Sequence, residues 1–421
     1  MQPRLSRIGQ KMSNLTGVRA IMKDIIETMQ AGSSGQWVNL SPGNPLILPE
    51  VEAMWREYTA KLMAGKDFGE VVGRYGTSQG YMPLIDAVVD FFNKNYGWGI
   101  ARKNVLVTPG SQALYFYAAN CFGGPDENGV SRKIVLPLSP DYTGYGGVTL
   151  DDDTLVAYKP TIDITGAHRF KYRPDFSRLH IDSNVGAVLF SRPANPTGNV
   201  LTDEEVHGIV NAAAKHDVPV LIDSAYAAPF PNLVFTKMTP IYGPNVIHCM
   251  SLSKAGLPGE RVGIAIGDEK YIEALECFQT NVGIHSSRFG QALAAQAIAS
   301  GDLLRAAETI IKPFYQRKAK MLTAAFDRYL PNDIPWYLHE AEGAIFAWLW
   351  LKDLPILDKE LYQRIKQHHV FVVPGEPFFP GLNEDWPHKR QCLRISLTAT
   401  EEELEKGAKV IGQVVSEVYG K

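Results

Sequence analysis

Short, uninterrupted apolar runs recur along the chain and alternate with stretches of helical periodicity. Six runs rich in Val, Ile and Leu occupy residues 105–107, 134–138, 185–190, 218–222, 246–250 and 262–266. A strand that is apolar at every position is buried on both faces, which is typical of a mostly parallel sheet covered by helices. Helical stretches separate the runs, at residues 83–95, 112–121, 203–216 and 269–281. This alternation predicts a doubly wound α/β fold.

The pattern changes near residue 310. The amphipathic stretch 303–330 contains Pro313, which would kink a helix there rather than end it. Later apolar runs, at 344–350, 370–373 and 393–397, are separated and followed by helical stretches, as in a smaller α+β domain. We therefore expect three parts: residues 1–64, an N-terminal segment contributing to the small domain; residues 65–310, the large domain; and residues 311–421, the small C-terminal domain.

Composition and charge narrow the class of protein. The chain has 421 residues, of which 45% are hydrophobic and 21% charged, so it can build a large core and is not disordered. Its formal net charge of -3 offers no basic surface for nucleic acid or an anionic membrane, and we expect a small-molecule partner. The four cysteines lack C-x-x-C spacing, so neither a metal cluster nor a disulfide framework is expected. Without an apolar run of the roughly 20 residues that span a membrane, the chain is expected to be cytoplasmic.

Residues 251–263 carry the strongest chemical signal. This segment follows an apolar run and holds Lys254 and Arg261 in a glycine-rich turn. A desolvated lysine at a strand end is the type that forms Schiff bases with carbonyl compounds. The hydroxyls of Ser251 and Ser253 could bind a phosphate group together with the Arg261 guanidinium. Taken alone, however, a lysine in a loop is more often a solvated surface charge.

The stretch SLSKAGLPGER at 251–261 resembles the lysine motif of the class I/II aminotransferases, which are fold-type-I enzymes dependent on pyridoxal 5'-phosphate. The resemblance implies that Lys254 is catalytic and holds this cofactor, with Ser251, Ser253 and Arg261 around the phosphate. It also implies a large cofactor-binding domain with a mostly parallel seven-stranded sheet sandwiched by helices, and a smaller α+β domain. One departure is visible, because the loop from Lys254 to Arg261 is one residue shorter than is usual in the family.

Three residues that follow in the family's order would hold the cofactor ring. Asn195, in an N-P-T-G turn, would hydrogen-bond the phenolic oxygen, which Tyr226 would share. Asp223, at the end of an expected strand, would pair with the pyridine nitrogen and keep it protonated, so that the ring withdraws electrons. The carboxyl end of a parallel strand is itself a frequent active-site position. Outside this context, Asn195 would indicate an ordinary Asn-Pro turn and Tyr226 a packing residue.

Two further positions match cofactor contacts of the family. Gly110, Ser111 and Gln112 lie between an expected strand and an expected helix, where the first amides of the helix form an anion site for the phosphate. The alternative is a simple strand-to-helix turn. Tyr142, in an S-P-D-Y segment, resembles the aromatic residue that stacks on the pyridine ring, although it could equally be a loop aromatic packed on the surface.

Other residues imply contacts with the substrate and with a second subunit. Arg394 matches the small-domain arginine that grips the substrate α-carboxylate, and a structural Asp or Glu is the alternative partner of a buried arginine. Gly43, in an S-P-G-N-P segment, would let the backbone approach the carboxylate, beside Asn195. Tyr75 would reach the cofactor phosphate of the neighbouring subunit, which implies a homodimer. No metal site is expected.

The resemblance also implies that the substrates are amino acids and 2-oxo acids. The wording of residues 251–261 and 41–45 is most similar to members that exchange the amino group of L-valine with pyruvate, giving 3-methyl-2-oxobutanoate and L-alanine. Lys254, Asp223 and Tyr226 would be the catalytic residues. Alternatives are an aminotransferase of broad specificity, a C–S β-lyase on the same fold, or a ligand-sensing regulator. The regulator is disfavoured because residues 1–40 show no basic recognition helix.

Two signals are set aside at this point. The run Gly144-Tyr145-Gly146-Gly147 lacks the G-x-G-x-x-G spacing of a dinucleotide-binding turn. The run Asp151-Asp152-Asp153 is expected to be a solvated loop. Near the N-terminus, one helix is expected, at residues 19–30.

Overall fold

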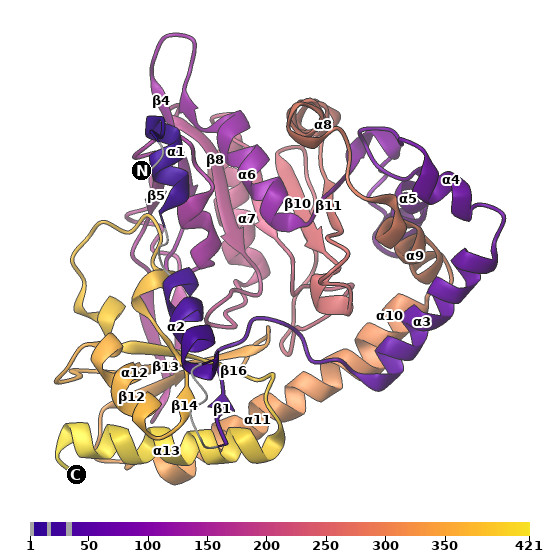
Figure 1. Ribbon diagram of the computed structural model, residues 1–421. Helices are drawn as coiled ribbons and strands as arrows, with labels where there is room; N and C mark the ends of the chain where they lie inside the picture. The colour runs from indigo at the N-terminus through magenta and orange to yellow at the C-terminus, as the bar shows by residue number, and fades with distance from the viewer. Residues whose placement is uncertain (1–3, 15–17, 31–35) are drawn as a thin grey trace.

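The computed structural model describes residues 4–14, 18–30 and 36–421. A mostly parallel sheet lies at the centre of a large lobe (Figure 1). Its strands are β2 (Val105–Thr108), β3 (Gly124–Pro125), β4 (Ser131–Leu136), β5 (Leu155–Ala157), β8 (Val185–Ser191), β9 (Val220–Asp223), β10 (Val246–Ser251) and β11 (Gly263–Ile266). They lie in the order β2, β11, β10, β9, β8, β4, and both β3 and β5 pair with the outer edge of β4. The sheet is therefore seven strands wide, as expected, although it contains eight strands.

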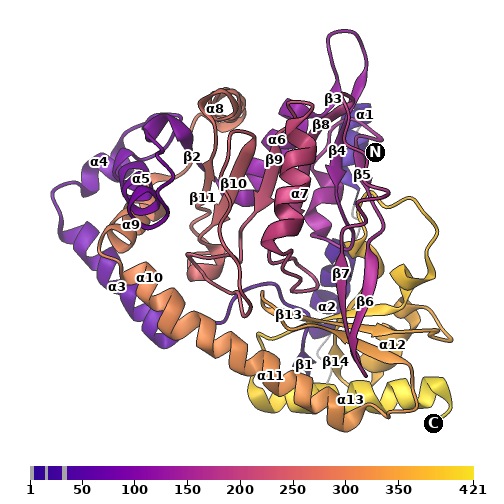
Figure 2. The same ribbon diagram turned by 180° about the vertical axis from the view of Figure 1, so that it is seen from behind.

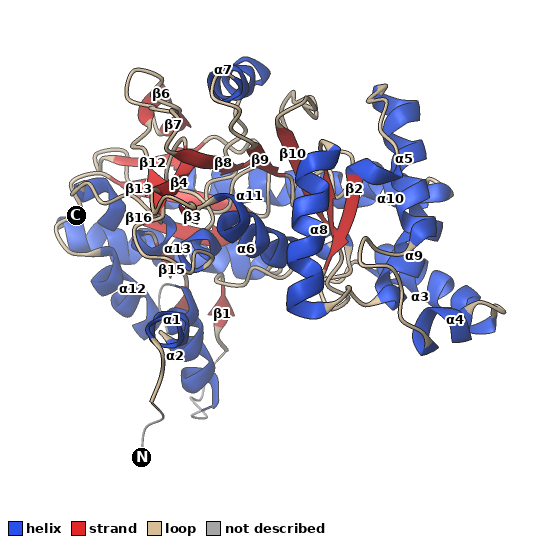
Figure 3. Ribbon diagram, turned by 90° about the horizontal axis from the view of Figure 1, so that it is seen from above, coloured by secondary structure: helices blue, strands red, loops and turns tan. Residues whose placement is uncertain are grey.

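Helices cover both faces of this sheet. α7 (Asp203–Ala214) lies against one face, and α6 (Ser111–Phe122) and α8 (Glu269–Gly283) lie against the other (Figures 2 and 3). Strand β8 is buried at every position, so neither of its sides can face water. α7 begins with a capping box, in which the Thr202 hydroxyl accepts from the Glu205 amide (3.1 Å) and the Glu205 carboxylate accepts from the Thr202 amide (2.8 Å). The structure confirms the α/β fold that the apolar runs predict.

A second sheet forms the core of a small lobe. In order across the sheet, its strands are β15 (Val373–Pro374), β16 (Cys392–Ser396), β13 (Phe346–Leu351), β12 (Trp336–His339), β7 (Arg169–Arg173) and β6 (Thr161–Gly166). The β6–β7 hairpin comes from the range 65–310 that the sequence assigns to the large domain, but β7 pairs in parallel with β12. Phe170, Lys171 and Tyr172 of β7 are all buried, so both sides of this strand are covered. Local sequence does not mark which of two sheets such a hairpin joins.

A long helical rod leads into the small lobe. α10 (Asp302–Ala306), a π-helical turn at Ala307–Ile311 and α11 (Lys312–Tyr329) follow one another without a break. Pro313 lacks an amide hydrogen, and the π-helical turn just before it lets the helix continue past this residue. α11 packs along the last helix, α13 (Glu401–Tyr419), at the bottom of Figure 1.

The N-terminal part of the chain contacts both lobes. α3 (Pro49–Ala64), α4 (Phe68–Gly73) and α5 (Met82–Tyr96) pack with α9 (Arg288–Ala299) at the edge of the large lobe. In the small lobe, β1 (Val38–Asn39) pairs with β14 (Val370–Phe371), next to α12 (Asp358–Gln367). Two helices precede them, α1 (Arg7–Ser13) and α2 (Val18–Gln30), of which the sequence predicts only the second. None of the described helices is long and apolar enough to cross a membrane.

Gly186 allows a test of how tightly β8 is packed. The register between β4 and β8 shifts at Gly186, and a Cβ there would lie 1.8 Å from the backbone oxygen of Phe122. We predict that Gly186→Ala lowers the free energy of unfolding by about 3 kcal/mol, because the backbone of a buried strand must move. Urea denaturation measures this change. Gly69→Ala in α4, where a Cβ meets nothing within 4 Å, should cost no stability, and equal stability of the two variants would contradict the prediction.

Candidate active site

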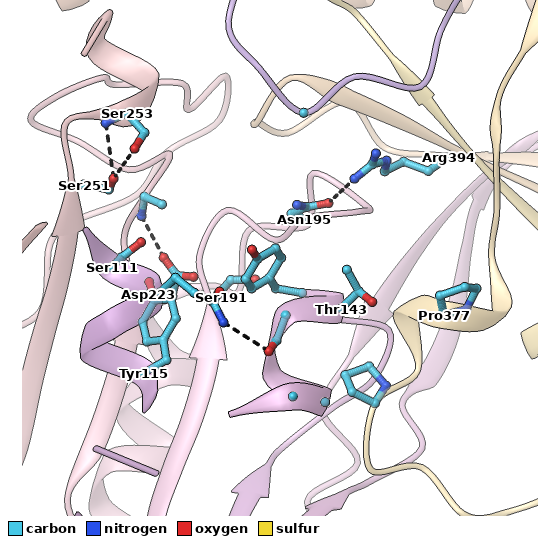
Figure 4. Close-up of a pocket in the computed structure, with 18 of the residues that line it drawn as sticks. Ser111, Tyr115, Thr143, Ser191, Asn195, Asp223, Ser251, Ser253, Pro377 and Arg394 are labelled. Atoms are coloured by element: carbon cyan, nitrogen blue, oxygen red, sulfur yellow. Dashed lines mark hydrogen bonds between the residues drawn. The ribbon is translucent and has the colours of Figure 1, made fainter. Parts of the chain in front are cut away.

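A cavity of about 950 Å³ lies between the two lobes, where β8, β9 and β10 end. Ligands of open α/β sheets bind at this edge. The lining residues include the sequence-predicted Gly43, Ser111, Gln112, Tyr142, Asn195, Asp223, Tyr226, Ser251, Ser253, Lys254, Arg261 and Arg394. Figure 4 shows Ser251 and Ser253 at one end of the cavity, Arg394 at the other, and Asp223 and Asn195 between them. Segments up to 353 residues apart in the sequence therefore meet here.

Lys254 lies in the turn after β10, and its amine donates a hydrogen bond to the backbone oxygen of Gly43 (2.6 Å). Burial, followed by the positive charges of Arg394 and Arg261, lowers the pKa of Lys254 to about 8, against the opposing effect of Asp223. An amine with this pKa is partly uncharged near neutral pH. The uncharged form is the one that attacks a carbonyl group and accepts a proton.

Ser251, Ser253 and Arg261 form a cradle beside the N-terminus of α6. The Ser251 hydroxyl donates to Ser253 Oγ (3.1 Å), and Arg261 Nη1 donates to the same oxygen (3.2 Å). Gly110 does not line the cavity but supports the cradle: its φ is +89°, and a Cβ there would lie 2.2 Å from Arg261 Nη2. The shorter loop ends with Arg261 at a φ of +53°, in the left-handed region. Two hydroxyls, a guanidinium and a helix N-terminus together suit a phosphate group.

Asp223 ends β9 with 5% of its surface exposed. The Tyr145 hydroxyl donates to Oδ2 (2.8 Å), and the Ala225 amide donates to Oδ1 (2.9 Å). Burial raises the pKa of this carboxyl, while the donors and the charge of Lys254 favour its ionised form. Tyr145 belongs to the G-Y-G-G run that the sequence analysis sets aside. Spacing could not reveal its role, because Asp223 is 78 residues away along the chain.

A second buried carboxyl, Asp141, is not among the residues that the sequence predicts. It accepts hydrogen bonds from the amides of Ser191 (3.0 Å) and Tyr142 (2.6 Å), and also from the Ser191 hydroxyl. Burial raises the pKa of Asp141 to about 7. These bonds tie the loop that carries Tyr142 to the end of β8. The sequence signal that could have pointed to Asp141 is its position as an acidic residue soon after an apolar run.

Arg394 lies in β16 and is buried, with 4% of its surface exposed. Nη1 donates to Asn195 Oδ1 (3.1 Å), Nη2 donates to the Ser41 oxygen (2.8 Å), and Nε is buried without a hydrogen bond. The guanidinium lies 4.2 Å from the ring centroid of Phe346. Among the described residues no Asp or Glu pairs with it, so the alternative of a structural carboxylate partner is not seen. Burial lowers the pKa of Arg394 to about 10, and a cation in this position is stabilised by an anionic ligand.

Two tyrosines lie close to these groups. The ring centroid of Tyr226 is 5.6 Å from the Lys254 amine, and burial raises the pKa of its hydroxyl, which therefore stays protonated and can donate a hydrogen bond. Tyr142 meets the ring of Tyr145 edge-on, with the centroids 5.3 Å apart. Because Tyr145 also donates to Asp223, one residue links the carboxylate to the predicted stacking ring.

Tyr75 lies outside this cavity. It is 83% exposed, contacts His285 edge-on at 5.8 Å, and lines a separate hollow with Arg288. It therefore makes no contribution to the cavity of its own chain. Its role in a neighbouring subunit stays a prediction.

The donor set fits one cofactor. The cradle suits a phosphate, the Asp223 carboxylate suits a protonated pyridine nitrogen, and the Lys254 amine suits an aldehyde. Asn195 has its oxygen bound to Arg394, which leaves its amide nitrogen to donate to a phenolic oxygen. The fold and the site thus define an enzyme that depends on pyridoxal 5'-phosphate.

Comparisons with known proteins give the family. The family described as "Aminotransferase class I and II" matches residues 36–411, so the chain belongs to the class I and II aminotransferases. It is 37% identical to the valine–pyruvate aminotransferase of Escherichia coli (strain K12) over 414 residues, which cover 98% of each chain. The crystal structure of valine-pyruvate aminotransferase from Salmonella typhimurium LT2 superposes with a TM-score of 0.87 at 36% identity, covering 96% of this chain and 100% of that one. A solved chain from Psychrobacter arcticum 273-4 gives a TM-score of 0.94 at 38% identity, with 100% of both chains covered.

Tyr145→Phe tests the contact between Tyr145 and Asp223, because it removes the hydroxyl and keeps the ring. We predict a fall in kcat of about tenfold, as for the loss of one hydrogen bond to a charged group. Without this donor the pKa of Asp223 rises further, so the acidic limb of the pH–rate profile should move to higher pH. Steady-state kinetics across the pH range measure both effects. Tyr117→Phe, at a buried tyrosine of α6, should leave the profile in place, and an unmoved acidic limb in Tyr145→Phe would refute the role.

Proposed function

We propose that this aminotransferase exchanges the amino group of L-valine with pyruvate in a ping-pong reaction that yields 3-methyl-2-oxobutanoate and L-alanine. The observation that carries the choice of substrates is the similarity to the valine–pyruvate aminotransferase of Escherichia coli, at 37% identity over 98% of both chains. The cavity supports it with apolar wall residues suited to a branched aliphatic side chain, namely Met12, Met22, Phe379 and Pro380.

Arg394 binds the α-carboxylate of the substrate in this proposal. Its guanidinium is already held in one orientation by Asn195 and the Ser41 carbonyl, and it has no carboxylate of its own chain as partner among the described residues. A carboxylate can therefore pair with it without displacing another anion. This fixes the amino acid so that its Cα–H bond is presented in one direction.

The proton is moved by Lys254. Pyridoxal 5'-phosphate supplies the electron sink that takes up the electron pair left at Cα. The Lys254 amine, with its pKa near 8, would accept the proton from Cα of the substrate and hold it for return. Asp223 keeps the pyridine nitrogen protonated, and Tyr226 and Asn195 donate to the phenolic oxygen. The phosphate is held by Gly110, Ser111, Gln112, Ser251, Ser253 and Arg261.

The substrate proposal is tested with a panel of amino donors against pyruvate and 2-oxoglutarate. We predict that kcat/KM for L-valine with pyruvate exceeds that for L-glutamate with pyruvate by about tenfold or more, since a buried apolar pocket rejects a second carboxylate. Formation of L-alanine measures the reaction. Preference for another donor would overturn the choice of valine, and ammonia release from cysteine conjugates without alanine would indicate a β-lyase. Lys254→Ala should remove turnover with every donor.

We further propose a homodimer in which Tyr75 reaches the phosphate cradle of the neighbouring subunit. Its support is the exposure of Tyr75 and its position outside the cavity of its own chain. An exposed tyrosine next to a hollow lined by Arg288 and Glu70 suits a contact between two copies.

Subunit mixing distinguishes the two possible locations of the Tyr75 contact. In a hybrid of Lys254→Ala and Tyr75→Ala subunits, one site regains both residues only if Tyr75 acts across the interface. We predict that a refolded equimolar mixture of the two low-activity variants recovers about one quarter of wild-type activity, because about half of the dimers are hybrids with one intact site. Activity that stays at the mean of the two separate variants would refute the shared site.

A further inference from the structure

The outer wall of the cavity is formed in part by Lys11 and Met12 of α1, by Asn14, which follows α1, and by Met22 of α2. α2 is anchored firmly to the small lobe. Ile25 is 2% exposed in the core, and the Asp24 carboxylate accepts hydrogen bonds from Lys366 (2.8 Å) and Tyr362 (2.7 Å) of α12. This side of the wall therefore has both apolar and ionic support.

α1 is held in a different way. None of its residues is buried, so packing contributes little to its position. Arg7 Nη2 lies 3.2 Å from Asp151 Oδ1, and Lys11 Nζ lies 3.1 Å from Asp152 Oδ1 and donates to the Asp151 backbone oxygen (2.7 Å). Arg7 and Lys11 are four residues apart and share one face of the helix. We call Arg7, Lys11, Asp151 and Asp152 the clasp. Asp151 and Asp152 lie in a solvated turn, as expected, and in addition they form ion pairs with α1.

The acidic side of the clasp has a rigid support in the large lobe. Asn120 of α6 accepts from the Leu150 amide (2.8 Å) and donates to the Val148 oxygen (2.7 Å), which fixes the loop just before Asp151. α6 is also the helix that begins at the phosphate cradle. The clasp thus places the N-terminal helix relative to the same element that positions the cofactor.

Met12 follows Lys11 directly and lines the cavity, yet it is 41% exposed. A thioether in this position has apolar surface that a substrate side chain could cover. The charge of Lys11 is already matched by Asp152, so the helix brings an apolar group to the wall without adding a free cation. An apolar wall favours an aliphatic donor over a dicarboxylic one.

From these contacts we infer that Met12 is a specificity-determining residue for the side chain of the amino donor, and that the clasp positions it. The inference rests on the proposed function, because it concerns the same substrate site. Its physical basis is that exposed ion pairs, rather than core packing, hold α1. A wall held in this way changes its position when the ion pairs are removed, while the cofactor site stays intact.

Met12→Ala tests the specificity directly. It removes most of one side chain from the wall, so kcat/KM for L-phenylalanine relative to L-valine should rise about tenfold, the usual scale for small changes in an apolar pocket. The visible absorbance of the bound cofactor should not change. An unaltered ratio in Met12→Ala would overturn the assignment of Met12.

The double variant Arg7→Gln/Lys11→Gln tests the positioning by the clasp. We expect the ratio of the two donors to shift in the same direction as in Met12→Ala, and KM for L-valine to rise about fivefold, the equivalent of about 1 kcal/mol of lost ion pairing. Amide hydrogen exchange over residues 4–14 should become faster. Lys11→Glu alone should raise KM for L-valine and speed amide exchange over residues 4–14. The variant Lys11→Glu/Asp152→Lys, which reverses the ion pair, should recover part of both effects.

Asp153→Asn is the matched control. It removes a carboxylate from the loop that carries Asp151 and Asp152, but Asp153 accepts from Lys133 through its backbone oxygen (2.9 Å), and among the described residues it forms no ion pair with α1. It should behave as wild type in kinetics and exchange. Unchanged donor ratio and exchange in the double variant would overturn the positioning role. If the wild-type enzyme does not use L-valine, the substrate proposal fails separately, and the same variants are compared with its best donor.

Discussion

The register of the parallel strands determines where every reacting group of this enzyme lies. Ser191 at the end of β8 is paired with Asp223 at the end of β9, and Asp223 is paired with Cys249 on β10. Ser251 follows two residues later, opposite Gly263 of β11. Because successive residues of a strand face opposite sides, a slip of one residue would turn Asp223 away from the cavity. Both faces of β8, β9 and β10 are buried, so the close fit of their side chains opposes such a slip, and packing in the core positions the reacting groups.

Several ionisable groups in and beside the cavity are buried. Burial raises the pKa values of Asp223 and Asp141 and lowers those of Lys254 and Arg394. The charged form of each of these groups is less favourable in its buried position than in water. In the proposed reaction, a protonated ring nitrogen would be the partner of Asp223 and a substrate carboxylate the partner of Arg394. Stability given up at this site is therefore returned when cofactor and substrate bind, which is a common property of active sites.

Most of the fold could be predicted because its signals are local. A run such as 185–190 is apolar at nearly every position. Thr202 and Glu205, only three residues apart, form the capping box that marks the start of a helix. The candidate site residues could be named because their motifs resemble those of a family. Tyr145 could not, since its importance comes from a hydroxyl that meets Asp223 only in the folded chain. Helix α1 and the position of the β6–β7 hairpin escaped prediction for the same reason, because each is held by partners far away in the sequence.

The β6–β7 hairpin limits how the two lobes can move. The chain leaves the large sheet after β5, adds two strands to the small sheet and returns to the large sheet at β8. Lys171 of the hairpin donates to the Val200 oxygen (2.8 Å), and Glu342 of the small lobe accepts from the Val200 amide (2.9 Å). The helical rod of α10 and α11 makes another crossing. The segment between β1 and α3 crosses as well, so the lobes are tied together at several separate places and a relative motion of the lobes is restricted to a hinge about them.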